Sequence, residues 1–403
     1  MKQALTGLRV LDFTQVMAGP FCAMLLGDLG AEVIKVEAPG GDSIRKIAGG
    51  QDNESPGFWA LNRNKRGIVI NLKDARGREI VRALSLRADV LIENFRPGVM
   101  SSLGLGYDDL REAAPSLIYA SISGFGQTGP YAQRGGFDLV AQGMSGIMSV
   151  TGEPCGAPVK CGIPVTDLGA GLFAMQAILA AYIYRLKTGE GQYLDTSLLE
   201  TGIALSVWES TEYFSTGETP QPVGSAHRMF APYQAIRCAD GYINLGSANQ
   251  RTWERFADAI GKSDMISRPD YKGNSDRLKN RKVLIEDIER VTVQKSREHW
   301  LSTLERAGVP CGPILDYSEV FNDPHVLIRG MVQQMVHPVG GQIKVTGSPV
   351  KFSETPAVTR RPAPLYGQHT AEVLGEIGVT PAEIDRLAGE NVIVLGAIPE
   401  PPR

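Results

Sequence analysis

Short apolar runs alternate with helical patterns over roughly the first 125 residues of the chain. The runs are rich in Val, Ile and Leu, and the stretches between them have apolar residues at three- and four-residue spacing. Apolar strands separated by helices are typical of a parallel, doubly wound α/β sheet. The expected strands are 9–14, 31–37, 68–72, 89–95 and 117–123, and the helices between them include 21–30 and 74–88.

In such a sheet, ligands bind beyond the carboxyl ends of the strands. The first crossover has no GxGxxG turn, so an ordinary dinucleotide site is not favoured. Gly27 and Gly30 fall within the helical pattern instead, where we expect them to allow close packing. The candidate ligand-binding loops follow Thr14, Leu72, Phe95 and Ser123.

The pattern changes in the second half of the chain. Residues 137–185 are mostly helical in pattern, and 192–200 combine a strand with the start of a helix. Between about 225 and 325 the chain carries more charge and amphipathic helices, which indicates a smaller α+β domain. A hairpin over 331–347 and two helices follow, and 399–403 is expected to be a loose tail.

Composition and charge narrow the class of protein. The net charge of −3 without a basic block gives no indication of nucleic-acid binding. Five cysteines without a CxxC pair predict neither a disulfide framework nor a structural metal site. Glycines interrupt the most apolar stretch, 168–184, so we expect a buried helix and no membrane span. The N-terminus lacks the apolar run of a signal peptide, and we expect a cytoplasmic protein.

Asp167 is the acidic residue whose context most favours chemistry. It follows Thr166 at the start of a helical pattern, where the helix dipole stabilises an anion. Gly169 and Gly171 allow other backbone to approach closely. A carboxylate can attack a thioester to give a mixed anhydride. The alternative is a plain helix cap.

Nine stretches together resemble the class III CoA-transferases, in the order and spacing of that family. They are LTGLRVLDFTQVMAGP, LGDLGAEVIKVEAPGGDSIR, NRNKRGIVINLK, DVLIENFRPG, SISGFGQTGP, GGFDLVAQGMSG, VTDLGAGLFA, KTGEGQYLDTSLLE and APYQAI. The resemblance implies transfer of coenzyme A between carboxylic acids, through an aspartyl anhydride and an enzyme-bound CoA thioester. Acyl-CoA and a small carboxylate would be substrates, with no permanently bound cofactor and no metal.

The same resemblance implies roles for individual residues. Asp167 matches the catalytic nucleophile of the family. Without the resemblance, Asn94 would be interpreted as a turn residue and Phe95 as a core residue. The implied CoA-binding residues are Val16, Met17 and Ala18 near the thioester, Asn71, Leu72 and Lys73 at the nucleotide end, and Asn94, Phe95 and Arg96 on a second loop.

The sequence differs from formyl-CoA transferase, another member of the family, at several positions. Ala38 and Ser102 stand where that enzyme has arginines for the CoA nucleotide. Its glycine-rich loop is also missing, which argues against oxalate and formate as substrates. Arg45, Lys65 or Arg66 could supply the lost positive charge, or each could lie exposed on the surface.

Racemases of the family are an alternative. They move a proton across the substrate's α-carbon with an aspartate and a histidine in a Gly-His-Asp motif, because racemisation needs a base on each face. The motif here is Gly136-Phe137-Asp138, and phenylalanine cannot transfer a proton. The sequence therefore favours a transferase, with an isomerase or a non-catalytic CoA-binding protein as alternatives.

The run SAHRMFAPYQAI resembles the succinyl-CoA-dependent members, which act on dicarboxylates. His227 and Arg228 could pair with the distal carboxylate of such an acid, or form a solvated turn. The family architecture implies an interlocked homodimer, with a Rossmann-like large domain from both ends of the chain. The expected domains are 1–224 and 326–403 for the large domain and 225–325 for the small one.

Overall fold

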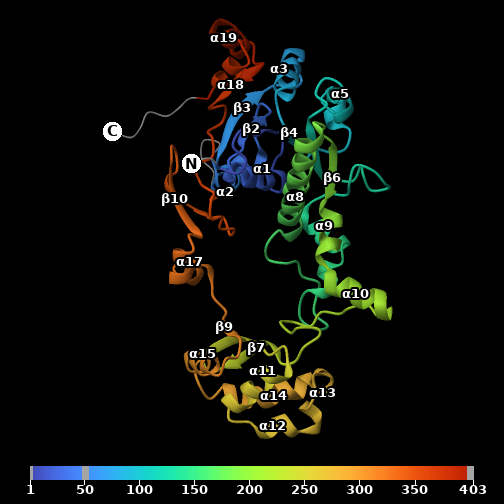
Figure 1. Ribbon diagram of the computed structural model, residues 1–403, viewed down its shortest axis with the longest axis vertical. Coiled ribbons are helices and arrows are strands. Elements are labelled where there is room, and N and C mark those ends of the chain that lie inside the picture. Colours follow the sequence, from blue (N-terminus) through green and yellow to red (C-terminus); the bar gives the residue numbers. More distant parts are fainter. Residues whose placement is uncertain (1–2, 48–53, 397–403) are drawn as a thin grey trace. The chain divides into compact units, whose positions relative to one another are not determined.

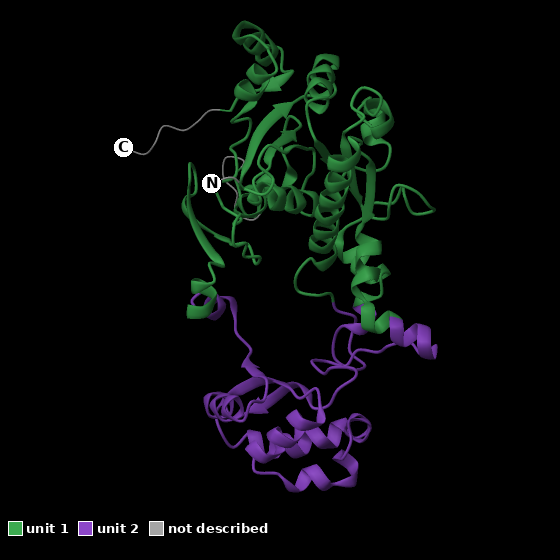
Figure 2. Ribbon diagram, in the orientation of Figure 1, with its two compact units in different colours: residues 1–147, 160–210, 324–403 green, residues 148–159, 211–323 purple. Residues whose placement is uncertain are grey.

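A computed structural model describes residues 3–47 and 54–396, and these fold into two compact units (Figures 1 and 2). The expected small domain, 225–325, lies in unit 2 except for its last two residues. Gly224 N–H donates to Gly152 O within unit 2, which ties the segment before 225 to an earlier loop. Unit 1 comprises 1–147, 160–210 and 324–403, and unit 2 comprises 148–159 and 211–323.

Unit 1 is built on a seven-stranded sheet of order β12-β3-β2-β1-β4-β5-β6. Every neighbouring pair is parallel except β12 and β3, so the predicted parallel α/β sheet is confirmed. The antiparallel β12 was not predicted, because two residues are too short for a pattern. The strands are β1 Arg9–Asp12, β2 Glu32–Glu37, β3 Lys65–Ile70, β4 Val90–Glu93, β5 Ile118–Ser123, β6 Tyr193–Ser197 and β12 Ile393–Val394.

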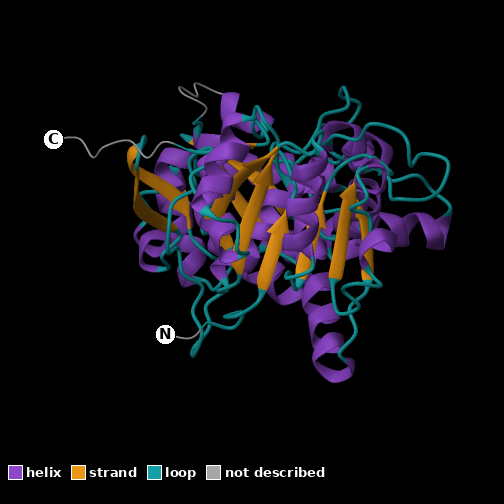
Figure 3. Cartoon of the chain, turned by 90° about the horizontal axis from the view of Figure 1, so that it is seen from above, coloured by secondary structure: helices purple, strands orange, loops and turns teal. Residues whose placement is uncertain are grey.

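Helices cover both faces of this sheet (Figure 3), which is why every residue of β3 and β5 is buried. Alternate side chains of β1 enter two different cores: Leu11 packs with α3, α18 and α19, and Val10 packs with α1 and α8. Burying each such aliphatic side chain contributes about 1.5–3 kcal/mol. These helices are α1 Ala18–Asp28, α3 Ala75–Ser85, α8 Val165–Thr188, α18 Thr370–Glu376 and α19 Pro381–Gly389.

The long helix α8 brings its second turn against the start of α1. A Cβ at Gly171 would lie 2.6 Å from Ala18 O, so only glycine permits this approach. By length and composition α8 could cross a membrane, but its Ala170, Ala174 and Ile178 lie in the core of unit 1. The contact places Asp167 near the loop between β1 and α1.

Unit 2 contains a three-stranded antiparallel sheet covered by helices. Its core is aromatic, with Trp253, Phe256, Tyr271 and Trp300 buried. Its elements are β7 Tyr233–Cys238, β8 Gly241–Gly246, β9 Cys311–Pro313, α11 Gln250–Ala259, α12 Asp264–Ser267, η2 Pro269–Tyr271, α13 Asn274–Lys279, α14 Arg281–Thr292 and α15 Arg297–Arg306.

The remaining elements connect these layers. The predicted hairpin is confirmed as β10 Val332–His337 and β11 Gly341–Thr346. The helix expected over 21–30 ends at Asp28, and Gly30 lies beyond it with a φ of 109°. The predicted tail, 399–403, lies outside the described residues. The other helices are η1 Ser43–Lys46, α2 Pro56–Asn62, α4 Val99–Ser102, α5 Tyr107–Leu110, α6 Asp138–Met144, α7 Ile147–Val150, α9 Leu198–Leu205, α10 Val207–Thr216, α16 Tyr317–Val320 and α17 Pro324–Ile328.

Candidate active site

A pocket of about 260 Å³ lies in unit 1 at the carboxyl ends of β1, β4 and β5. It brings Asp167 together with two of the three predicted CoA-binding groups. This is the arrangement expected of a doubly wound sheet, whose loops converge at that edge. Its lining comprises Gln15, Val16, Met17, Ala18, Asn94, Phe95, Arg96, Pro97, Ile122, Ser123, Gly124, Ala132, Arg134, Gly135, Gly136, Phe137, Asp167 and Leu198.

A second, largely apolar pocket of about 430 Å³ holds the third predicted group, Asn71, Leu72 and Lys73. Gln15 and Phe95 line both pockets, so the two cavities adjoin. Lys73 is exposed, and its ammonium group makes no ion pair among the described residues.

Asp167 is the third residue of α8, yet it does not cap the helix. Within the described chain its carboxylate makes no hydrogen bond or ion pair. Asp138 takes the capping role instead: its Oδ1 accepts from Thr166 N at 3.0 Å and from Thr166 Oγ1 at 2.7 Å. The carboxylate of Asp167 is therefore free to react.

The surroundings of Asp167 make it an unusually basic carboxylate. Burial, and then the negative charge of Asp138, raise its pKa to about 6. The group is still ionised at neutral pH, and a more basic carboxylate is a stronger nucleophile. Gln142 donates to Asp138 Oδ2 at 2.7 Å and accepts from Cys161 N at 2.8 Å, which fixes this arrangement.

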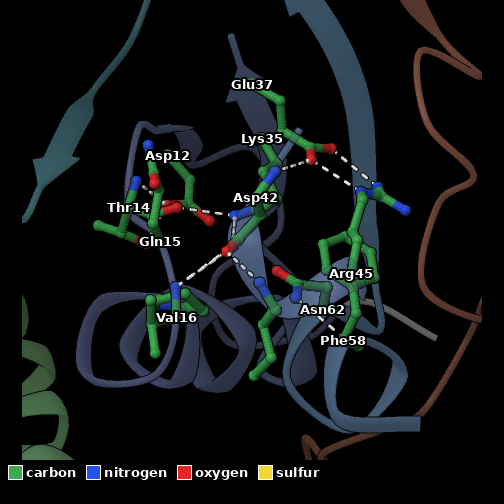
Figure 4. A network of polar contacts seen from close by, with 12 residues as sticks. Asp12, Thr14, Gln15, Val16, Lys35, Glu37, Asp42, Arg45, Phe58 and Asn62 are labelled. Carbon is green, nitrogen blue, oxygen red and sulfur yellow. Dashed lines mark hydrogen bonds and ion pairs between the residues drawn. The ribbon is translucent and has the colours of Figure 1, made fainter. Parts of the chain in front are cut away.

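The backbone beside Asp167 is strained. Val16 has a φ of 67°, a conformation that β-branched residues rarely adopt and that costs about 1–3 kcal/mol. Figure 4 shows how it is held: Val16 N–H donates to both oxygens of Asp42, at 3.2 and 3.3 Å. Lys35 Nζ pairs with Asp42 at 3.1 Å and donates to Thr14 O at 2.7 Å. Both charged side chains are completely buried.

A second brace holds the preceding residue. The Asn94 side chain donates to Gln15 O and accepts from Gln15 N, each at 2.8 Å. Asn94 was assigned a CoA contact from the sequence; the structure gives it this bracing role, and the contact itself stays a prediction. The loop that lines the pocket is thus fixed from the ends of both β2 and β4.

The suggestion that Arg45, Lys65 or Arg66 replaces missing CoA-binding arginines is wrong, and none of them is a surface residue. Arg45 is buried and pairs with Glu37 and Glu54, each at 2.8 Å. Lys65 is buried and pairs with Asp12 at 2.9 Å, and burial lowers its pKa to about 8. Arg66 is held by Glu32, Glu372 and Glu376. The positive charge of each of these three residues is therefore already paired with carboxylates of the same unit.

Other predicted residues have local partners. Arg228 pairs with Glu212 at 3.4 Å and donates to Gln221 O at 3.1 Å, all within unit 2. His227 Nδ1 accepts from Met229 N at 3.0 Å. Their role toward substrate stays a prediction. Phe137 is 71% exposed and lines the pocket, which has no histidine in its lining.

Sequence reasoning missed several residues of this site. Asp138 was considered only as part of a motif, and its effect on Asp167 required their spatial contact. Gln15 and Arg134 also line the pocket. Lys35 and Asp42 carried a usable signal, because a lysine inside the apolar strand Glu32–Glu37 needs a buried partner.

Comparisons with known proteins identify the family of the chain. The model of CoA-transferase family III matches residues 5–370. The human succinyl-CoA:glutarate CoA-transferase is 42% identical, over 93% of this chain and 86% of that protein. The Haloarcula hispanica succinyl-CoA:mesaconate CoA-transferase is 39% identical, over 93% and 97%.

A solved structure has the same fold. The crystal structure of a CAIB/BAIF family protein from Brucella suis superposes with a TM-score of 0.83 at 37% identity, covering 94% of this chain and 100% of that one. Sequence and fold therefore agree along nearly the whole length, and the chain belongs to CoA-transferase family III.

Proposed function

We propose that this enzyme transfers CoA from succinyl-CoA to a small dicarboxylate of four to six carbons, through a covalent intermediate on Asp167. The observation that carries the proposal is the Asp167 carboxylate, which has a raised pKa and no partner in the described chain, in a pocket that adjoins a second, largely apolar one lined by Lys73. The succinyl-CoA:glutarate and succinyl-CoA:mesaconate relatives support the choice of acids.

The reaction begins when an oxygen of Asp167 bonds to the thioester carbon. The C–S bond breaks, and CoA leaves as a thiolate with the bonding electrons, so Asp167 carries an acyl anhydride. Attack on the aspartyl carbonyl then releases the donor acid as a carboxylate. The acceptor carboxylate enters there, directly or after the thiolate has formed a thioester on Asp167. Finally the thiolate attacks the acceptor's carbonyl, which forms the new acyl-CoA and restores Asp167 without net proton uptake.

The remaining expectations are part of the same proposal. The nucleotide of CoA occupies the apolar pocket beside Asn71, Leu72 and Lys73, and its thioester reaches Val16–Ala18. The working form is a homodimer in the cytoplasm. No resident cofactor or metal takes part, because the Asp167 carboxylate is the first nucleophile of the reaction and the CoA thiolate is the second.

A transfer assay in D₂O tests the reaction. Succinyl-CoA is mixed with a panel of mono- and dicarboxylates, and thioesters are followed by mass spectrometry. We expect a new dicarboxylyl-CoA with total thioester conserved, and a loss of at least about 10³-fold for Asp167→Asn, because the amide is not a nucleophile. Deuterium at the α-carbon of a branched acyl-CoA, without a new thioester, would instead identify an isomerase.

A further inference from the structure

The charged side chains of the Asp167 pocket are unbalanced. Its lining contains Asp167 and two arginines, Arg96 and Arg134. Both arginines are exposed, and among the described residues neither guanidinium pairs with a carboxylate. Arg134 lies over the ring of Tyr131, with its Cζ 4.0 Å from the ring centroid, a contact that orients the side chain but leaves its charge uncompensated.

The two arginines come from different loops, and these loops lie close together. Arg96 follows β4, and its Nη2 lies 3.3 Å from the position of a Cβ at Gly135, the residue after Arg134. The loop carrying Arg134 is packed tightly against the end of β5, because a Cβ at Gly124 would lie 2.6 Å from Gly136 Cα. The Arg96 side chain thus reaches the loop that carries Arg134, and both arginines line the pocket that contains Asp167.

The substrates create a need for positive charge at this position. A dicarboxylate brings its second carboxylate into a pocket that already contains the Asp167 anion, with Asp138 close enough to raise the pKa of Asp167. At this end of an acyl-CoA the thioester is neutral, since the CoA phosphates belong to the nucleotide end. A guanidinium binds a carboxylate through two parallel N–H donors, which a single ammonium cannot do.

We propose that Arg96 and Arg134 form the subsite for the distal carboxylate of the acyl group and of the acceptor acid, and thereby select dicarboxylates over monocarboxylates. This inference rests on the proposed function. It moves this role from Arg228, which already pairs with Glu212, to arginines of the pocket that contains Asp167. It also gives Arg96 a role other than the CoA contact implied by the sequence.

The test compares two acceptors of equal length, glutarate and its monoamide glutaramate, with succinyl-CoA as donor. Because both acceptors follow the same donor step, the ratio of their kcat/KM values isolates recognition of the distal group. We expect the wild-type ratio to favour glutarate and to fall about tenfold in Arg134→Gln and in Arg96→Gln, with partial recovery in the lysine variants. Arg111→Gln, which changes an exposed arginine paired with Asp108 outside the pocket, should keep the wild-type ratio.

CoA binding, measured by calorimetry on the same variants, separates the alternatives. An unchanged ratio overturns the inference, and an unchanged ratio with weakened CoA binding shows that the arginines hold CoA phosphates instead. A wild-type enzyme that uses both acceptors equally also overturns it. A wild-type enzyme that transfers CoA to no acceptor of the panel overturns the proposed function itself, which is a different result.

Discussion

The negative charge of Asp138 contributes to the reactivity of Asp167, although Asp138 itself does not react. Burial raises the pKa of Asp167, and the Asp138 charge raises it further, to about 6. The nucleophile must be ionised, so activity is lost as the pH falls through this value. We therefore expect the acid limb of kcat/KM to have a midpoint near pH 6, measured with succinyl-CoA and glutarate.

Asp138→Asn should move that limb to lower pH, because it removes the second cause of the raised pKa. Its Oδ1 can still accept from Thr166, but its Nδ2 cannot accept the hydrogen bond that Gln142 donates to Asp138 Oδ2. At pH 7 the less basic nucleophile should also be slower, by up to about tenfold. Asp108→Asn is the control, since Asp108 is an exposed residue paired with Arg111. An acid limb that does not move in Asp138→Asn would show that another group controls it.

The buried pair of Lys35 and Asp42 is the other residue-scale feature of the site. Lys35→Met leaves the Asp42 carboxylate buried with its hydrogen bonds to Val16 and Ile44 but without its cation. Breaking a buried pair on one side costs about 3–5 kcal/mol, so we expect urea unfolding to show a loss of that size. Lys344→Met, at an exposed position of β11, should change the free energy of unfolding by less than about 0.5 kcal/mol. Equal effects of the two variants would contradict this account.

At the scale of elements, the site depends on how closely α8 approaches α1. Gly171→Ala puts a methyl group 2.6 Å from Ala18 O, and backbone cannot move aside as a flexible side chain could. We expect a destabilisation of about 1–3 kcal/mol and a lower kcat, because the shift separates Asp167 from the Val16–Ala18 loop. Thermal unfolding and steady-state kinetics measure both effects.

Gly375→Ala is the matched control. Gly375 lies in α18, and a Cβ there meets nothing within 4 Å. Alanine is the better helix former, so this variant should gain up to about 1 kcal/mol with unchanged kinetics. If Gly171→Ala behaves in the same way, close packing at α8 does not position the nucleophile.

The elements that the sequence predicted are those with a strong local pattern. The parallel strands could be predicted because they are apolar runs, and they are apolar because helices cover both faces of the sheet. The stretch 151–164, expected to be mostly helical, contains no helix, because its prolines and glycines break any periodicity. Asp167 was found through its motif, whereas the pairing of Lys65 with Asp12 joins segments that are far apart in the chain and could not be deduced locally.

At the scale of the whole molecule, the apolar surface of unit 1 is the feature that the isolated chain leaves unexplained. Leu186 is 69% exposed, Val207 61% and Trp208 58%, and they lie on α8 and α10. Only 39% of the residues in the most apolar part of α8 are buried. Large exposed apolar side chains are typical of an interface. We infer that a second copy of the chain covers them.

A dimer that covers these helices buries them only when two chains meet, so folding and association should be coupled. Sedimentation equilibrium should give twice the 43.5 kDa mass of the chain, and the urea midpoint should rise with protein concentration. A stable monomer would have a midpoint independent of concentration, and its mass would refute the homodimer directly.

Trp208→Glu supplies a second probe, because a charge buried at the interface destabilises the dimer by several kcal/mol. The same substitution at the exposed Leu395, on the C-terminal segment, should leave both measurements unchanged if the interface is formed by α8 and α10.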